Sequence, residues 1–150
     1  MDETDRRLIA LLQEDATLTS EALGRALNLS PSQAGRRRQK LEASGVLAGY
    51  GARVDAQRAG LSVQAFIQVE MAEHGPEAAA AFARLTELSR EIVSAWTLTG
   101  EADYLLRAYC EDLAALNRLI HERLLPHRAV ARVRSQIVMD QLKPDAPLPV

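Results

Sequence analysis

Apolar residues recur at helical spacing in two stretches at the start of the chain. The first stretch follows an acidic run, Asp2–Asp5, which suits a helix N-terminus because the helix dipole is positive there. Its apolar positions are Leu8, Ile9, Leu11 and Leu12. Thr19 then lies where an N-cap is expected, ahead of a second apolar face. That face consists of Leu23, Ala26 and Leu27. The pattern predicts one helix that ends near Asp15 and a short second helix that ends before Asn28.

The start of a third helix is marked by a run of capping residues. Ser30 and Gln33 have the spacing of a capping box, and Pro31 falls at the first helical position, where its missing N–H costs nothing. Gly45 is placed to end the helix in a left-handed conformation. A helix of about fourteen residues is therefore predicted over Pro31–Ser44.

Basic residues dominate this third predicted helix, whose apolar stripe is narrow. The stripe consists of Ala34 and Leu41, and the charged positions are Arg36, Arg37, Arg38 and Lys40. A well-capped basic helix that follows a short helix and a tight turn is typical of a helix-turn-helix unit, whose second helix lies in the DNA major groove. A solvated basic face with no partner is the alternative explanation of these charges.

The DNA-binding interpretation assigns a role to each polar side chain of this region. The residues expected to reach base edges are Ser32, Gln33, Arg36 and Gln39. Those expected to contact phosphates are Arg37, Arg38, Lys40 and Arg53, and Ser30 lies at the start of the same interface. Two short apolar runs around glycines, residues 46–54, are expected to form a wing-like hairpin or an interdomain strand. The DNA-binding domain would then span residues 1–54, with a linker over residues 55–60.

The rest of the chain alternates between strand and helix patterns. Apolar and polar side chains alternate strictly over residues 62–71, which is typical of a strand with one covered face. Helical spacing follows over Pro76–Leu88, and again between an N-cap at Asp112 and Pro126. The remaining strands are predicted over residues 92–98, 104–110 and about 130–141.

The order βαββαβ is the ferredoxin-like plan, so the chain is assigned to the α+β class. An N-terminal (winged) helix-turn-helix would be followed by a ferredoxin-like domain over residues 61–142 and a Pro-rich tail over residues 143–150. Helices on one side of a four-stranded antiparallel sheet leave its other face to be covered. Dimerisation is the expected cover at this size.

Composition and charge refine this assignment. Of the 150 residues, 47% are apolar, which is enough for a buried core and excludes a disordered or collagen-like chain. The net charge of -2 would argue against nucleic acid, but the distribution is uneven: residues 30–58 hold six basic and two acidic side chains, whereas residues 59–150 hold nine and twelve. Cys110 is the only cysteine, and no apolar stretch is long enough to span a membrane. A cytoplasmic protein is expected.

A set of spaced positions in the first fifty residues carries a family resemblance. The positions are Asp2, Asp5, Leu8, Ile9, Leu11, Leu12, Leu29–Ser32, Arg37, Leu41–Glu42, Gly45–Val46 and Gly49–Tyr50. They resemble the DNA-binding half of the Lrp/AsnC (feast/famine) transcriptional regulators, and the resemblance covers residues 2–142. One position departs: Arg38 stands where the family usually has a branched apolar residue. We expect Arg38 either to reach a phosphate or to pair with a carboxylate.

The resemblance implies a sequence-specific regulator of transcription that binds double-stranded DNA at the nucleoid. It also implies a homodimer that assembles further into a tetramer or octamer and senses a small effector, commonly an amino acid. No cofactor or metal is expected.

The loop over residues 97–104 matches the Gly-x-x-Asp-Tyr turn that lines the effector pocket of this family. The resemblance places Thr97, Thr99, Gly100, Asp103 and Tyr104 in that pocket, and Ile137 and Val138 on its apolar wall. A glycine turn exposes N–H groups to a carboxylate, and Asp103 is suited to accept from an ammonium group or to brace the loop. A plain β-turn is the alternative.

Two other functions are weighed against the regulator. Siroheme decarboxylases resemble the same two-domain plan, but such an enzyme is expected to hold histidines in its cavity and has no use for a basic helix. The three histidines, His74, His121 and His127, show no metal-ligand spacing. An amino-acid sensor without DNA binding is the second alternative. The sequence favours a regulator that is not an enzyme.

Overall fold

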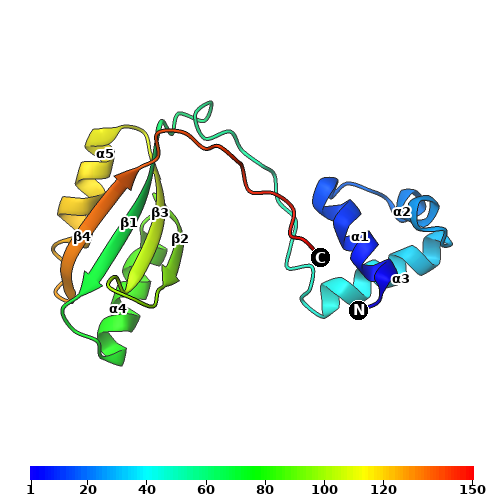
Figure 1. Cartoon of the computed structure of the whole chain (residues 1–150), viewed down its shortest axis with the longest axis horizontal. Helices are drawn as coiled ribbons and strands as arrows, with labels where there is room; N and C mark the ends of the chain where they lie inside the picture. The colour runs from blue at the N-terminus through cyan, green and yellow to red at the C-terminus, as the bar shows by residue number, and fades with distance from the viewer. The chain divides into compact units, whose positions relative to one another are not determined.

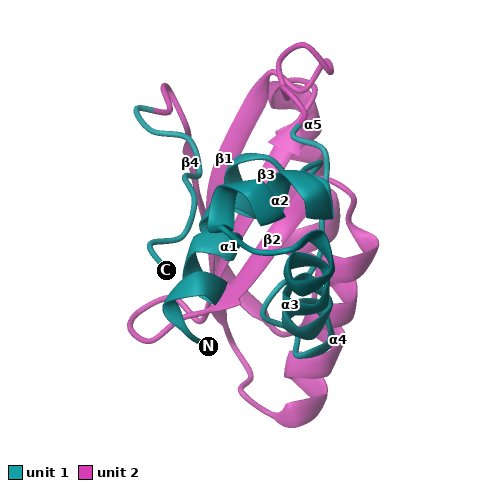
Figure 2. Cartoon of the chain, turned by 90° about the vertical axis from the view of Figure 1, so that its right-hand side faces the viewer, with its two compact units in different colours: residues 1–53, 142–150 teal, residues 54–141 magenta.

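The structure is a computed structural model that describes residues 1–150. Its contacts divide the chain into two compact units (Figures 1 and 2). One contains Met1–Arg53 together with Leu142–Val150, and the other contains Val54–Gln141. Each unit has a hydrophobic core of its own. None of the helices combines the length and the apolar content that crossing a membrane requires.

Three helices make up the first unit: α1 (Glu3–Glu14), α2 (Ser20–Leu27) and α3 (Pro31–Ala43). Their apolar faces share one core, which consists of Leu8, Ile9, Leu12, Leu23, Leu27, Ala34 and Leu41. Asn28 adopts the left-handed conformation (φ 56°) that turns the chain between α2 and α3. Gly24 permits this close turn, because an added Cβ would lie 2.8 Å from the carbonyl oxygen of Leu29. The helix-turn-helix predicted from the sequence is confirmed.

Side-chain caps begin all three helices of this unit. The Asp2 carboxylate accepts from the Asp5 N–H at 2.8 Å, and the Thr19 hydroxyl accepts from the Ala22 N–H at 3.2 Å. At α3, the Ser30 hydroxyl accepts from the Gln33 N–H at 3.2 Å while the Gln33 side chain accepts from the Ser30 N–H at 2.9 Å. This reciprocal pair is the predicted capping box, and it fixes where α3 begins.

The chain between α3 and the second unit contains no strand, so the predicted wing or interdomain strand is wrong. Residues 46–54 are irregular and exposed apart from Leu47, which packs against the core of the helices. A strand needs a partner for its backbone groups, and two glycines, Gly49 and Gly51, weaken this short stretch. Residues 55–61 instead close a local turn, in which the Leu61 N–H donates to the Ala56 carbonyl oxygen at 2.8 Å.

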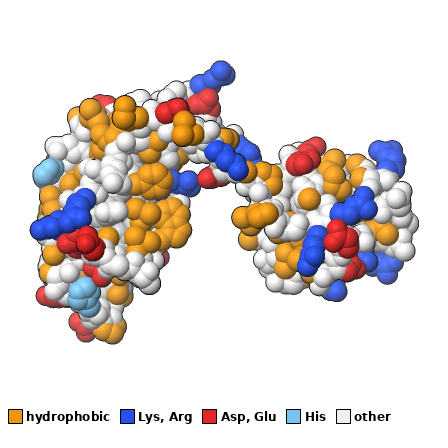
Figure 3. Space-filling view, viewed as in Figure 1, with side chains coloured by type: hydrophobic (Ala, Val, Ile, Leu, Met, Phe, Trp, Pro, Cys, Tyr) orange, Lys and Arg blue, Asp and Glu red, His pale blue; other side chains and the backbone are white.

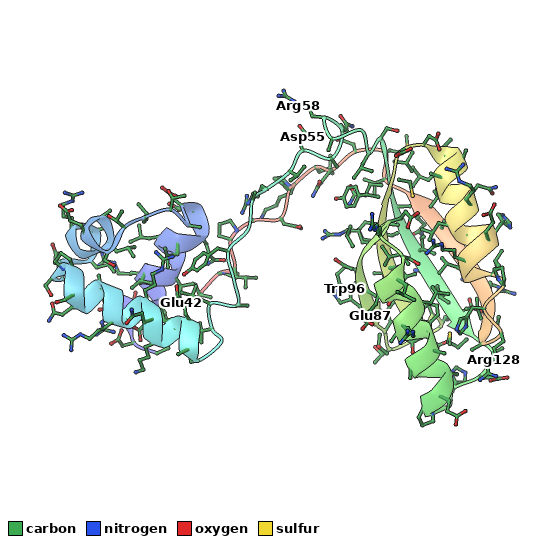
Figure 4. All side chains as sticks on the ribbon, turned by 180° about the vertical axis from the view of Figure 1, so that it is seen from behind. Glu42, Asp55, Arg58, Glu87, Trp96 and Arg128 are labelled. Atoms are coloured by element: carbon green, nitrogen blue, oxygen red, sulfur yellow. The ribbon has the colours of Figure 1, made fainter.

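The second unit has the predicted βαββαβ order. Its elements are β1 (Val63–Met71), α4 (Pro76–Leu88), β2 (Ile92–Thr97), β3 (Tyr104–Cys110), α5 (Leu113–Arg118), the π-helical segment η1 (Leu119–Leu124) and β4 (Val130–Ile137). The strands form one antiparallel sheet in the order β2-β3-β1-β4. The helices cover one face of this sheet (Figure 4), as a ferredoxin-like domain requires.

The alternation along β1 decides which side chains enter the core. Val63, Ala65, Ile67, Val69 and Met71 are buried against the helices, together with Phe82 of α4 and the only cysteine, Cys110. The opposite face of the sheet carries apolar and aromatic side chains without a cover within the chain, namely Phe66, Trp96, Leu105 and Tyr109. Hydrophobic side chains gather over these strands in Figure 3.

The final helix is the one element whose internal geometry the sequence did not predict. A continuous helix was expected between Asp112 and Pro126, but its second half, Leu119–Leu124, is wound as a π-helix. Leu119 and Leu124 are both buried in the core. The wider winding changes the angular spacing, so that residues five apart share a face.

Candidate nucleic-acid interface and ligand site

The charged side chains of α3 divide into an outward pair and an inward pair. Arg36 and Lys40 lie on the exposed side of the helix and take part in no ion pair. Gln39 and Ser32 are exposed on the same side. This surface is the one that a polyanion would meet, because hydrogen-bond donors and positive charge are presented together on it.

Arg37 belongs to the inward pair and is bound by the start of α1. One of its terminal nitrogens donates to the Asp2 carboxylate at 2.8 Å and to the Asp5 carboxylate at 2.6 Å. The Asp5 side chain is only 8% exposed, so this contact lies at the edge of the core. Arg37 therefore fastens α3 to α1 across 32 residues of sequence, and little of its charge is left for a phosphate.

The contacts of Asp2 and Asp5 lower the pKa of both carboxyl groups. The N–H of Asp5 and then the Arg37 guanidinium hold the pKa of Asp2 below its ordinary value of 3.8. Burial acts to raise the pKa of Asp5, but the N–H of Asp2 and the Arg37 guanidinium outweigh it, so that this pKa is lowered as well. Both carboxylates are therefore charged at neutral pH.

Arg38, the second inward residue, binds three separate segments of the first unit. Its Nε lies 3.0 Å from the Glu42 carboxylate and 3.1 Å from the Tyr50 hydroxyl, and a terminal nitrogen donates to the Leu18 carbonyl oxygen at 3.1 Å. The Tyr50 hydroxyl donates to the same Glu42 oxygen at 2.7 Å, and the guanidinium lies 4.8 Å from the centre of the Tyr50 ring. We call the contacts among Arg38, Glu42 and Tyr50 the Arg38 clasp. Of the two expectations for Arg38, the structure shows the carboxylate pair.

The clasp also lowers the pKa of Glu42. The Tyr50 hydroxyl is the larger cause and the Arg38 guanidinium the second, because both stabilise the charged carboxylate. Sequence reasoning did not find Glu42 or Tyr50 as partners of Arg38. The spacing from Arg38 to Glu42 was a usable signal, because residues four apart lie together on a helix.

The remaining predicted DNA contacts lie at the start and beyond the end of α3. Ser30 and Gln33 hold each other in the capping box, which leaves the amide nitrogen of Gln33 as its available donor. The Ser32 hydroxyl lies 3.1 Å from that of Ser30. Arg53 is exposed and has no ion pair, but it lies in the irregular segment beyond α3 rather than on the helix.

A small pocket in the second unit contains part of the predicted ligand site. Thr97, Asp103 and Tyr104 line it, together with Met71, Glu73, His74 and Ala79, which sequence reasoning did not place there. Its volume is about 100 Å³. Pockets that enclose small ligands usually measure about 300–1,000 Å³, so this pocket is smaller than a usual ligand site.

The Asp103 side chain connects the loop after β2 to the end of β1. One of its carboxylate oxygens accepts from the Met71 N–H at 2.7 Å, which ties the loop to the end of β1. The other oxygen lies 3.4 Å from the Nδ1 atom of His74. Gly100 has the positive φ expected of the turn (123°), but neither it nor Thr99 lines the pocket. Asp103 thus braces the loop through one oxygen, and its other oxygen lies beside His74, which also lines the pocket.

The structure does not bring Ile137 and Val138 to this pocket. Tyr104 pairs with Val69 at one end of β1, whereas Ile137 pairs with Ala65. Four residues of strand separate these positions by about 13 Å. The antiparallel register between β1 and β4, which the sequence does not specify, is the reason that this predicted wall is absent within one chain.

The fold and the two surfaces together define a transcriptional regulator with a DNA-binding domain and a separate ligand-binding domain. Residues 1–42 match the AsnC-type helix-turn-helix domain, and residues 64–148 match the Lrp/AsnC ligand binding domain. The chain belongs to the Lrp/AsnC family of transcriptional regulators.

Individual relatives agree with this assignment along the whole chain. The chain is 31% identical to the DNA-binding transcriptional activator DecR of Escherichia coli, covering 100% of this chain and 99% of that protein. It is also 31% identical to the leucine-responsive regulatory protein of Rhizobium meliloti, over 95% of this chain and 92% of that one. Among solved structures, a transcriptional regulator from Neisseria meningitidis in complex with L-Met is 34% identical and superposes with a TM-score of 0.94, covering 99% and 96% of the two chains. The protein is accordingly a transcriptional regulator and not an enzyme.

Proposed function

We propose that this regulator reads a specific operator through the outward face of α3 and acts as a homo-oligomer whose state is set by an amino-acid effector. The observation that carries the DNA contact is the division of the α3 arginines. Arg37 and Arg38 are held by carboxylates of the chain, whereas Arg36 and Lys40 are exposed and without ion pairs. The bidentate donor Arg36 suits a guanine edge, and Lys40 suits a phosphate.

Base edges would also be met by Ser32, Gln33 and Gln39, and Ser30 lies at the start of this interface. Arg53 would add a phosphate contact from the segment beyond α3. Arg37 and Arg38, both expected from the sequence to contact phosphates, are assigned mainly to holding α3 in place. The protein would act in the cytoplasm, at the nucleoid.

Oligomerisation is proposed through the uncovered face of the sheet. Trp96 is 44% exposed there, and Phe66, Leu105 and Tyr109 are half-buried beside it. An isologous dimer would cover this face with the same face of a second copy, and a tetramer or octamer would follow from further contacts. A second chain would also supply the wall that the ligand pocket lacks.

The effector is proposed to be an amino acid bound beside Asp103. Two observations support it: the pocket combines the Asp103 and Glu73 carboxylates with Thr97 and Tyr104, and a similar regulator from Neisseria meningitidis was solved with L-Met. A carboxylate suits the α-ammonium group of an amino acid. Ligand binding would shift the balance between assemblies that hold the helix-turn-helix units at different separations.

Calorimetry with L-methionine, followed by the other amino acids, tests the effector site. We expect Asp103→Ala to abolish binding while leaving operator affinity unchanged, because Asp103 lies in the second unit. Asp103→Asn is the matched variant, since its amide oxygen still accepts from the Met71 N–H but carries no charge. Loss of binding in both variants assigns Asp103 to the ammonium group, and loss in Asp103→Ala alone assigns it to bracing the loop. Equal affinity in both variants and the parent would overturn the site.

A further inference from the structure

Gln33 belongs both to the cap of α3 and to the surface that would meet DNA. Its Oε1 atom accepts from the Ser30 N–H at 2.9 Å, and because a backbone N–H can only donate, the oxygen of the amide must be the atom that faces Ser30. The amide nitrogen makes no hydrogen bond within the chain, and the side chain is exposed. The capping box therefore leaves Gln33 as a hydrogen-bond donor towards a partner.

This orientation changes which base a glutamine can recognise. A free glutamine binds adenine with its oxygen and nitrogen together, because adenine presents a donor, N6, beside an acceptor, N7. For Gln33 the same contact would require the oxygen to leave the Ser30 N–H, which would break one of the two bonds of the capping box. Guanine presents two acceptors, O6 and N7, and thymine presents only one. A side chain that only donates is therefore best matched to guanine.

Arg36 and Lys40 continue the same row of donors. At about 100° per residue, positions 33, 36 and 40 lie within about 60° of one another around α3. Their side chains are exposed and line one hollow of about 530 Å³ beside the start of α1. The carboxylates of Asp2 and Asp5, which also line this hollow, are bound by Arg37. Arginine and lysine donate and do not accept, so this side of α3 offers donors to DNA.

We propose that each half-site contains two guanines one or two base pairs apart, one facing Gln33 and the other facing Arg36. The inference rests on the proposed function, in which the outward face of α3 reads base edges. Gln33 and Arg36 are three residues apart, which is about 4.5 Å along the helix axis. Successive base pairs are about 3.4 Å apart, so the two side chains meet bases separated by one or two steps. Lys40, one turn further along, contacts a phosphate.

Selection of binding sites from random DNA by the full-length protein tests this motif. We expect the parent to enrich both guanines, and replacement of either guanine by adenine to lower the affinity roughly ten-fold or more. Arg36→Gln should change one of the two guanines to adenine. A glutamine at that position lies beyond the first turn of the helix, so both of its amide atoms are available to the base. Glutamines at positions 33 and 36 would thus select different bases.

Gln33→Glu is the matched variant at the cap. A glutamate retains the capping box but presents an acceptor where Gln33 presents a donor. It should change the guanine at one position to cytosine, whose N4 group donates, and leave the other guanine unchanged. Ala43→Glu adds the same charge to the exposed surface of α3 and should lower the affinity without altering the motif. Gln33→Ala, which adds no charge, should accept any base at the position facing Gln33.

The outcomes separate this inference from the proposed function. The base facing Gln33 is identified as the one whose preference is lost in Gln33→Ala, and circular dichroism checks that the helices are retained. Adenine, thymine or cytosine at that position in the parent motif would overturn the inference, and so would a parent-like motif in Gln33→Ala. A parent that enriches no motif would instead overturn the proposed function.

Discussion

The outward and inward faces of α3 use the same residue types for different purposes. Arg36 and Arg37 are neighbours in sequence, yet Arg36 is exposed without an ion pair and Arg37 is bound by two aspartates at 2.6 and 2.8 Å. The difference is geometric, because successive helical residues are about 100° apart and only one of the two positions borders the Ala34 and Leu41 stripe. Arginine at the border stabilises the fold, and arginine opposite the stripe is available for DNA.

This comparison shows that the number of basic residues on a helix can exceed the number that are available to bind a polyanion. Four basic residues lie on α3, but two of them are neutralised by Asp2, Asp5 and Glu42. Non-specific affinity grows with the number of phosphates neutralised, so α3 contributes about half of what its sequence suggests. Specific binding would then depend on base contacts and on two or more helix-turn-helix units acting together.

The largest effect is expected from Arg36→Ala. Removing a bidentate base contact costs about 1–3 kcal/mol of discrimination, so the preference for operator over unrelated DNA should fall by roughly ten- to a hundred-fold. Competition binding at fixed salt measures the ratio. Arg25→Ala is the matched control, because Arg25 is an exposed arginine of α2 paired with Glu21. An unchanged ratio in Arg36→Ala would show that the outward face does not read bases.

Lys40→Ala should have a smaller effect that does not depend on sequence. Affinity for operator and for unrelated DNA should fall by the same several-fold factor, because a phosphate contact is lost in both complexes. The slope of log affinity against log salt should decrease by about one. Titrations at several salt concentrations give this slope. A change confined to the operator would instead assign Lys40 to a base.

The smallest effect is expected from the inward face, and it concerns stability rather than DNA. The folded-state pKa values of Asp2 and Asp5 lie below 3.8, so their contribution is present above that pH and is lost as pH falls through the lowered values. Asp5→Asn should therefore destabilise the first unit at pH 7 and destabilise it less at pH 2, where part of the stabilisation by the charged carboxylate is already lost.

Urea unfolding followed by the NMR amide signals of α3 measures this change. Fluorescence of Trp96, which lies in the second unit, serves as the internal control and should report the same midpoint in both proteins. A destabilisation of equal size at pH 7 and pH 2 would contradict the role of the Asp5 charge.

Local signals in the sequence were sufficient for most of the fold. Ser30, Pro31 and Gln33 specify the start of α3 within four residues, and the alternation over Val63–Met71 specifies which face of β1 is buried. Such features depend on neighbours in the chain, so periodicity and capping chemistry predict them.

Features that depend on distant partners were missed. Arg37 meets Asp5 across 32 residues and Arg38 meets Leu18 across 20, and neither distance is encoded in a local pattern. The pocket shows the same limit, because placing Ile137 required the register of β4 on β1. The π-helical winding of Leu119–Leu124, two of whose leucines are buried in the core, also had no signal in the local sequence pattern.

Cys110 gives the molecule a practical property. It is the only cysteine, it is 1% exposed in the core of the sheet, and burial raises the pKa of its thiol. A thiol reagent needs an accessible thiolate, so the native protein should remain unlabelled. A cysteine introduced at an exposed position such as Gln39 would then be modified alone. The parent sequence is in this way a ready background for spin or fluorophore labels that measure the separation of recognition helices directly in an assembled regulator.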